Sequence, residues 1–242
     1  MLPDRAEELR ARFVELAPEG FEETEAFGGI ELAAYGPAAD RVLAAFPDAF
    51  VTNVEEGWED RWREFHHSVA IGPLWIGPPW EQPPAGTTVV VVDPGRAFGT
   101  GAHPSTRLAL ELLLQEARGS LLDVGCGSGV ISIAASKLGF APVVAVDVDE
   151  VAVEVTRENA AANGVAVDAR VADARDGALP AATLAVANIS LELVQASAPA
   201  IEARRLITAG YLATDRPSLP GFTHVRRLDR DGWAADTFSR DR

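Results

Sequence analysis

The sequence predicts an α/β protein with a Rossmann-like parallel sheet and a small α+β domain before it. Residues 121–147 read as a buried strand, a glycine turn, a helix and a second strand that ends on Asp147. Further alternating strands and helices follow, as expected of a parallel sheet. Residues 4–54 instead follow the order helix, strand, strand, helix, strand, which is typical of a ferredoxin-like unit.

Length and composition fit a water-soluble protein with a sizeable core. The chain has 242 residues, 48% of them hydrophobic, and contains neither an eighteen-residue apolar run nor a signal-peptide pattern at its start. A single cysteine, Cys126, allows no internal disulfide. We therefore expect a cytoplasmic monomer that does not bind membranes.

Acidic residues are concentrated at the start of the chain. Residues 1–85 contain 17 acidic residues against 6 arginines, which gives this segment a net charge of −11 (6 − 17), out of −15 for the whole chain. This surplus disfavours nucleic acid and favours a basic protein partner, although solubility alone would also explain it.

The predicted N-terminal domain covers residues 1–56. Its elements are a helix at 4–17, strands at 21–27 and 30–35 around Gly28-Gly29, a helix at 38–46 and a strand at 50–54. Only three residues precede the first helix, so we expect the first strand of a ferredoxin-like unit to be missing.

A linker is predicted at residues 57–85, before a catalytic domain at 86–242. The linker holds four of the five tryptophans, a short helical pattern at 58–65 and the proline-rich run Pro83-Pro84-Ala85. It could form a lid over a ligand or simply pack between the domains.

The stretch after the strand at 89–92 reads as a shaped loop. Residues 93–106 contain three glycines and two prolines, and Pro104 marks the start of the next helix. Because this helix leads into the central strand, we expect its first turn, with Ser105 and Thr106, to approach the glycine turn.

The glycine turn indicates the ligand. Gly125, Gly127 and Gly129 follow Asp123 in a G-x-G-x-G spacing, whereas the NAD fingerprint is G-x-G-x-x-G. This form resembles the first motif of S-adenosylmethionine (SAM) dependent methyltransferases. Asp147, at the end of the next strand, can accept both hydroxyls of a ribose. The alternative is a turn that merely lets helix and strand pack closely.

The remaining elements complete the predicted sheet. We expect a helix at 150–163 capped by Asp149, a strand at 166–172 followed by Asp173, a strand at 184–187 ending on Asn188, a helix at 191–205, a strand at 206–213, and an antiparallel pair at 225–228 and 233–238.

Four motifs in order resemble the ribosomal protein L11 methyltransferases (PrmA). They are VDPGRAFGTGAHPST at 92–106, LLDVGCGSGVISIAASKLG at 121–139, VDVD at 146–149 and VANIS at 186–190. The resemblance implies SAM-dependent methylation of lysine and N-terminal amines on a basic protein of the large ribosomal subunit, with the N-terminal domain recognising that substrate. It implies SAM contacts at Thr106, Gly125, Asp147 and Asn188, and a loop near the methyl group shaped by Phe98, Gly99 and Thr100. Gly127 and Asp173 are further candidate cofactor contacts.

Catalysis by positioning suits these residues best. The sequence offers no convincing general base, and His103, the nearest candidate, precedes a proline and could be structural. Asn188 is expected to hold the acceptor amine, although an asparagine at a strand end can also serve as a turn former. With Phe98 and Thr100 it forms the predicted catalytic set, and no metal site is expected.

Two other kinds of function stay open. A nucleic-acid base or small-molecule N-methyltransferase would share the cofactor site, but base methyltransferases carry Asn-Pro-Pro-aromatic where this chain has Asn188-Ile189-Ser190-Leu191. An inactive SAM-binding module is the second alternative.

Overall fold

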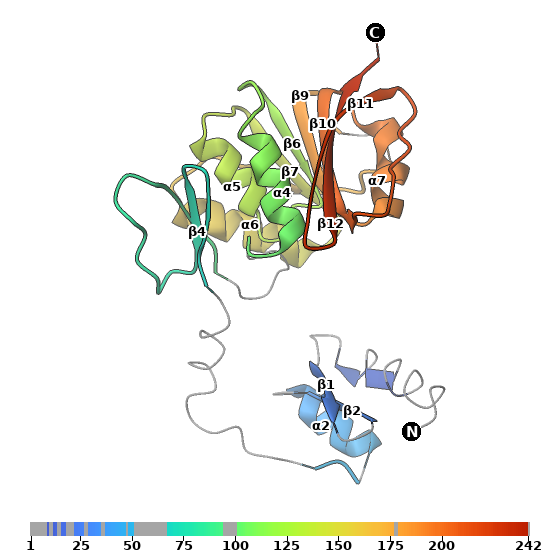
Figure 1. Ribbon diagram of the computed structural model, residues 1–242. Helices are drawn as coiled ribbons and strands as arrows, with labels where there is room; N and C mark the ends of the chain where they lie inside the picture. Colours follow the sequence, from blue (N-terminus) through green and yellow to red (C-terminus); the bar gives the residue numbers. More distant parts are fainter. Residues whose placement is uncertain are drawn as a thin grey trace. The chain divides into compact units, whose positions relative to one another are not determined.

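The computed structural model divides the chain into two units, residues 1–58 and 59–242 (Figure 1). It describes residues 67–93, 101–176 and 179–241, together with residues 9, 12–13, 16–17, 22–26, 29–34, 37–46 and 48–50 of the first unit. The domain boundaries at 56 and 85 remain predictions.

The described part of the first unit contains a hairpin and a helix. Strands β1 (Glu22–Ala26) and β2 (Gly29–Ala33) pair antiparallel from Glu22↔Ala33 to Ala26↔Gly29, as the glycine pair predicts. Helix α2 (Pro37–Ala45) follows, and Phe46 beyond it stacks on Phe13 with ring centroids 5.9 Å apart. The third predicted strand lies almost entirely outside the described residues.

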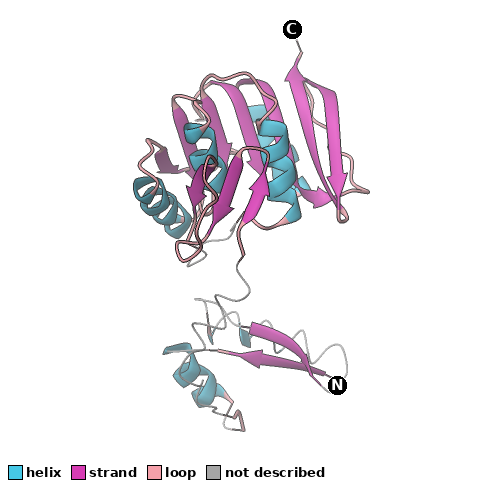
Figure 2. Cartoon of the chain, turned by 60° about the vertical axis from the view of Figure 1, so that its left-hand side comes forward, coloured by secondary structure: helices cyan, strands magenta, loops and turns pink. Residues whose placement is uncertain are grey.

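A seven-stranded sheet organises the second unit (Figure 2). Its strands are β6 (Leu121–Val124), β7 (Val143–Asp147), β8 (Asp168–Val171), β9 (Ala182–Asn188), β10 (Ala203–Leu212), β11 (Phe222–Arg230) and β12 (Trp233–Arg240). The spatial order is β11-β12-β10-β9-β6-β7-β8, and β12 alone runs antiparallel to its neighbours β10 and β11. This arrangement confirms the predicted Rossmann-like fold.

Helices cover both faces of this sheet. Helices α4 (Pro104–Leu113), α5 (Val130–Lys137) and α6 (Glu150–Ala162) pack on one face, and α7 (Leu191–Ser197) packs on the other (Figure 1). Apolar residues at helical spacing in α4, such as Leu108 and Leu112, are fully buried against the strands. Within the described residues, no helix combines the length and apolar character that a membrane span needs.

A second, three-stranded sheet packs beside α4 and α5. Strands β3 (Val69–Ile71), β4 (Leu74–Gly77) and β5 (Thr88–Val91) contribute buried side chains, including Leu74 and Val90, to the same core as those helices. The amide of Asn163, after α6, fixes β5 by bonding both the N–H and the carbonyl of Val91 at 2.9 and 2.6 Å. Residues 69–77 of the predicted linker thus form two strands that belong to the second unit.

The helix predicted at 191–205 is too long. Helix α7 ends at Ser197, a 3₁₀ turn spans Ala198–Ala200, and β10 begins at Ala203 in register with Ala182 of β9. Pro199 cannot donate a backbone hydrogen bond, and pairing with β9 captures the residues after it. The terminal hairpin is confirmed, with its turn at Asp231-Gly232.

Candidate functional site

A cavity of about 500 Å³ opens at the carboxyl ends of the central parallel strands. Its walls come from the glycine turn after β6, the ends of β7, β8 and β9, the first turns of α4 and α7, and Trp233 at the start of β12. Ligands of open α/β sheets bind at this edge, where loops from several strands converge.

The glycine turn is held in shape by its neighbours. Gly125, Gly127 and Gly129 all have positive φ angles, of 73°, 54° and 80°. The N–H groups of Gly125 and Cys126 donate to the carbonyl of Val146 at 2.8 and 3.1 Å. These hydrogen bonds therefore tie the glycine turn to the end of β7, about 20 residues further along the chain.

Asp147 joins this turn to the next helix. Its Oδ2 accepts from the N–H of Gly127 at 3.0 Å, and its Oδ1 accepts from the N–H of Asp149 at 3.1 Å. Each carboxylate oxygen can accept more than one hydrogen bond, so Asp147 keeps capacity for two ligand hydroxyls. Asp149 in turn caps α6 by accepting from Val151 N–H at 2.9 Å, as predicted from the sequence.

Asp123 lies beneath the glycine turn and is 1% exposed. The Ser132 hydroxyl donates to its Oδ2 at 2.7 Å, while Oδ1 has no hydrogen-bond partner in the described part of the chain. Burial raises the pKa of Asp123 to about 6, although the Ser132 hydrogen bond opposes the shift. This carboxyl group does not line the cavity, and its hydrogen bond with Ser132 joins β6 to α5.

Asn188 and Thr106 line the cavity and contact each other. Asn188 Nδ2 donates to Thr106 Oγ1 at 3.0 Å, joining residues 82 apart in the sequence. The Oδ1 atom of Asn188 is buried and has no hydrogen-bond partner among the described residues. One of the two N–H donors of the amide is used by Thr106, and the oxygen without a partner can accept a hydrogen bond from a ligand.

His103 acts as the N-cap of α4. Its Nδ1 accepts from the N–H of Ser105 at 3.3 Å and lies 2.8 Å from the Ser105 hydroxyl. Its ring meets Trp233 edge-on with centroids 4.5 Å apart, and burial lowers the pKa of the imidazole. These contacts favour the structural interpretation of His103 over a role as general base.

Asp173 lines the cavity beyond β8 and is bound by Arg175. The Arg175 Nε donates to Oδ1 at 2.9 Å, and its Nη2 contacts Oδ2. This side-chain pairing lowers the pKa of Asp173 to about 2, so the carboxylate is ionised at neutral pH.

The cavity brings together all the predicted cofactor contacts, which are Thr106, Gly125, Gly127, Asp147, Asp173 and Asn188. Phe98 and Thr100 lie outside the described residues. Ser190, the last residue of the VANIS motif, also lines the cavity, as do Trp233 and Gly210, to which no local pattern of the sequence pointed. Within the described ranges, no three His, Cys, Asp or Glu side chains gather as a metal would require.

Comparison with known proteins decides the family. The model of the family described as ribosomal protein L11 methyltransferase (PrmA) matches residues 33–235, most of the chain.

The chain belongs to this family.

Individual PrmA relatives agree with the family match. A ribosomal protein L11 methyltransferase of Myxococcus xanthus is 39% identical over 194 residues, covering 74% of this chain and 66% of that protein. One of Symbiobacterium thermophilum is 37% identical over 212 residues, covering 79% and 68%. The first eight curated relatives are matched over 38–68% of their own length.

A solved PrmA structure supports the same fold. The ribosomal protein L11 methylase of Lactobacillus delbrueckii subsp. bulgaricus superposes with a TM-score of 0.67 at 27% identity. That superposition covers 73% of this chain and 100% of the solved one. The two chains therefore share their fold over this region.

Proposed function

We propose that this chain is a SAM-dependent methyltransferase that modifies lysine and N-terminal amines of ribosomal protein L11. The single observation that carries the proposal is the shared cavity of Asp147 and Asn188 in a chain of the PrmA family. One side offers a carboxylate to a cofactor, and the other offers an unpartnered amide oxygen to an acceptor.

The residues of the first side fit SAM. Asp147 takes the ribose hydroxyls, while the backbone of Gly125 and Gly127 lies beside the methionine part of the cofactor. Asp173 completes the contacts on this side, and Thr106 reaches the cofactor from beside Asn188. When bound, SAM supplies a methyl group on a sulfonium, which is electrophilic enough to be taken by a neutral amine.

The acceptor must lose a proton before it reacts. A lysine with a pKa of about 10.4 costs roughly 4–5 kcal/mol to neutralise at pH 7, and an α-amine with a pKa near 7.7–8.0 costs about 1 kcal/mol. Partial burial in the cavity lowers this cost, because desolvation disfavours the ammonium. Asn188 Oδ1 accepts from the amine and orients its lone pair, and Phe98 and Thr100 shape the loop near the methyl group.

Recognition of the substrate is assigned to the N-terminal unit. We infer a ferredoxin-like unit whose acidic surface attracts a basic ribosomal protein in the cytoplasm, in keeping with 17 acidic residues against 6 arginines in residues 1–85. Association should weaken as salt rises, because exposed charges are screened within about 8–10 Å at physiological ionic strength. Binding that is insensitive to salt would contradict this assignment.

Methyl transfer to purified L11 tests the proposal. Radiolabelled SAM is mixed with the chain and either L11 or ribosomal RNA, SAM binding is measured by calorimetry, and the label is located by mass spectrometry. We expect SAM binding and labelled amines on L11. SAM binding without any transfer would identify an inactive module instead, and transfer to RNA but not to L11 would identify a base methyltransferase.

A further inference from the structure

Strand β10 contains a bulge directly beside Asn188. Ala209 pairs with Asn188 on one side and with Ala235 on the other, whereas Tyr211 pairs with Ala234. Gly210 is the extra residue between them and has a φ of 96°. A bulge of this kind re-aims the chain locally, and bulges are frequent next to active sites.

The bulge makes room for the backbone that follows Asn188. A Cβ atom at Gly210 would lie 2.4 Å from the carbonyl oxygen of Ile189 and 2.8 and 3.0 Å from its C and N atoms. These are backbone atoms, so no rotation of a side chain could relieve the collision. Residues 188–190 can therefore lie against β10 only because residue 210 has no side chain.

Ile189 is confined from its other side as well. A Cβ atom at Gly125 would lie 2.3 Å from Ile189 Cγ2, so this side chain fills the space above the glycine turn. The residue next to Asn188 is thus held between two glycines, one from the cofactor turn and one from β10. Asn188, the residue before it, pairs with Ala209 at the edge of the same bulge.

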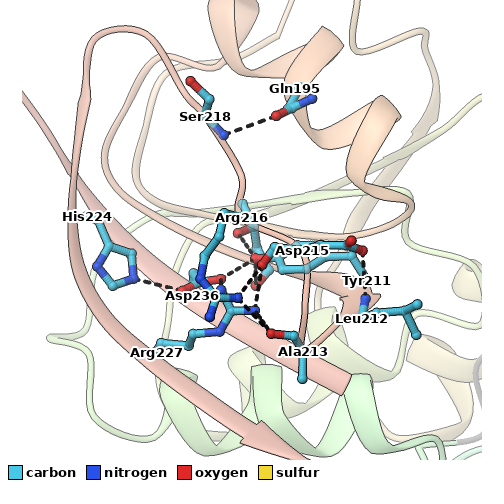
Figure 3. Close-up of polar contacts among 11 residues, drawn as sticks. Gln195, Tyr211, Leu212, Ala213, Asp215, Arg216, Ser218, His224, Arg227 and Asp236 are labelled. Carbon is cyan, nitrogen blue, oxygen red and sulfur yellow. Dashed lines mark hydrogen bonds and ion pairs between the residues drawn. The ribbon is translucent and has the colours of Figure 1, made fainter. Parts of the chain in front are cut away.

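A polar cluster that includes Tyr211 and Asp236 adjoins the bulge (Figure 3). The Tyr211 hydroxyl donates to Asp236 Oδ2 at 2.8 Å and lies 2.6 Å from the Thr208 hydroxyl, two residues before the bulge. Asp236 is fully buried, and His224 Nε2 lies 2.7 Å from its Oδ1. Burial raises the pKa of Tyr211, so this tyrosine stays a hydrogen-bond donor at neutral pH.

We infer that Gly210 is a positioning residue for methyl transfer, acting through the Ile189 backbone on the amide of Asn188, with Tyr211 fixing the bulge. The inference rests on the proposed function, because it concerns the acceptor side of that site. It assigns to β10 a role in turnover that acts through the backbone after Asn188. Displacing an orienting group by about 1 Å can slow a reaction about 100-fold.

The variant Gly210→Ala tests the inference against Gly139→Ala. Gly139 follows α5 with a nearly identical φ of 93°, but a Cβ atom there would meet nothing within 4 Å. Both variants place an alanine at a φ near +95°, and only Gly210→Ala also displaces Ile189. Stability, SAM affinity by calorimetry, and kcat and KM for L11 are measured for the two variants and the wild-type protein.

We expect Gly210→Ala to lower kcat about 100-fold with SAM affinity within about twofold of wild type. Gly139→Ala should lose stability but keep kcat within about twofold. Equal kcat values in the two variants would overturn the inference. Wild-type protein that binds SAM and methylates nothing would instead overturn the proposed function, and the inference with it.

Should Gly210→Ala fail to fold, Tyr211→Phe decides the question. This change keeps the ring and removes only the hydroxyl that joins Thr208 to Asp236. We expect kcat to fall about tenfold at unchanged SAM affinity, since the bulge loses its support. Wild-type kcat in a folded Tyr211→Phe variant would contradict the inference.

Discussion

The two sides of the cavity are built in different ways. On the cofactor side, Asp147 bonds the N–H groups of Gly127 and Asp149, all within a stretch of 23 residues from Gly127 to Asp149 that runs from the glycine turn through α5 and β7. On the acceptor side, Asn188 meets Thr106 across 82 residues and abuts a bulge in a third segment. The cofactor side is therefore local in sequence, and the acceptor side is assembled only by the fold.

The two sides also differ in whether their hydrogen-bond acceptor atoms already have partners. The Asp147 oxygens already hold the glycine turn, so a ligand adds to an existing network. The Asn188 Oδ1 is buried with no partner in the described residues, so a ligand there would supply a missing hydrogen bond. This difference suggests that substitutions on one side should change cofactor affinity, and those on the other should change turnover.

The largest expected effect is that of Asn188→Ala. Removal of the amide should lower kcat at saturating SAM by about 100-fold, because the acceptor amine loses its orienting oxygen. The Kd for SAM should change much less, and the melting temperature should stay close to that of the wild type. A SAM affinity that falls as far as the turnover would show that Asn188 serves the cofactor instead.

Asp147→Ala should affect the cofactor side alone. Losing hydrogen bonds to a charged group should weaken SAM binding at least about tenfold, which is about 1.4 kcal/mol. Asp149→Ala is the matched control, since it removes the cap of α6 two residues away and should cost stability without changing SAM affinity. Calorimetry that finds wild-type affinity in folded Asp147→Ala would refute the ribose assignment.

A smaller effect concerns Asp123 beneath the glycine turn. Its native pKa of about 6 exceeds the ordinary value of 3.8, so the folded protein binds more protons than the unfolded chain between these values. The contribution of Asp123 to stability therefore falls as pH rises, by about 1 kcal/mol between pH 5 and pH 7.

The substitution Asp123→Asn removes the titrating carboxyl group and with it this dependence of stability on pH. Urea unfolding of both proteins without SAM should show the wild type losing stability relative to Asp123→Asn as the pH rises from 5 to 7. Parallel pH profiles would mean that the carboxyl group stays ionised when buried.

The same contrast explains what the sequence could predict. The spacing of Gly125, Gly127 and Asp147 defines the cofactor side because turn, helix cap and strand end are properties of neighbouring residues. The Asp231-Gly232 turn was predicted for the same reason. Asn188 and Thr106 were placed near the site by the resemblance to PrmA and by the strand ends, but no spacing could show that they touch.

Long-range contacts account for what was missed. Gly210 looks like an ordinary strand glycine until Ile189 is seen against it, and Trp233 reaches the cavity only because β12 is inserted beside β10. Helix α7 was predicted too long because pairing of Ala203 with β9 overrides the helical pattern of the sequence. Tertiary pairing of this kind leaves no periodic signal in the segment itself.

A single-turnover experiment with L11 tests the division between the two sides most directly. Labelled SAM is titrated against the wild type, Asp147→Ala and Asn188→Ala, and the rate of methyl transfer is followed as a function of SAM concentration. We predict that Asp147→Ala approaches the wild-type rate once SAM is saturating, whereas Asn188→Ala stays about 100-fold slower at every SAM concentration above its Kd. Recovery of Asn188→Ala at high SAM, or a persistent defect in Asp147→Ala, would contradict the account.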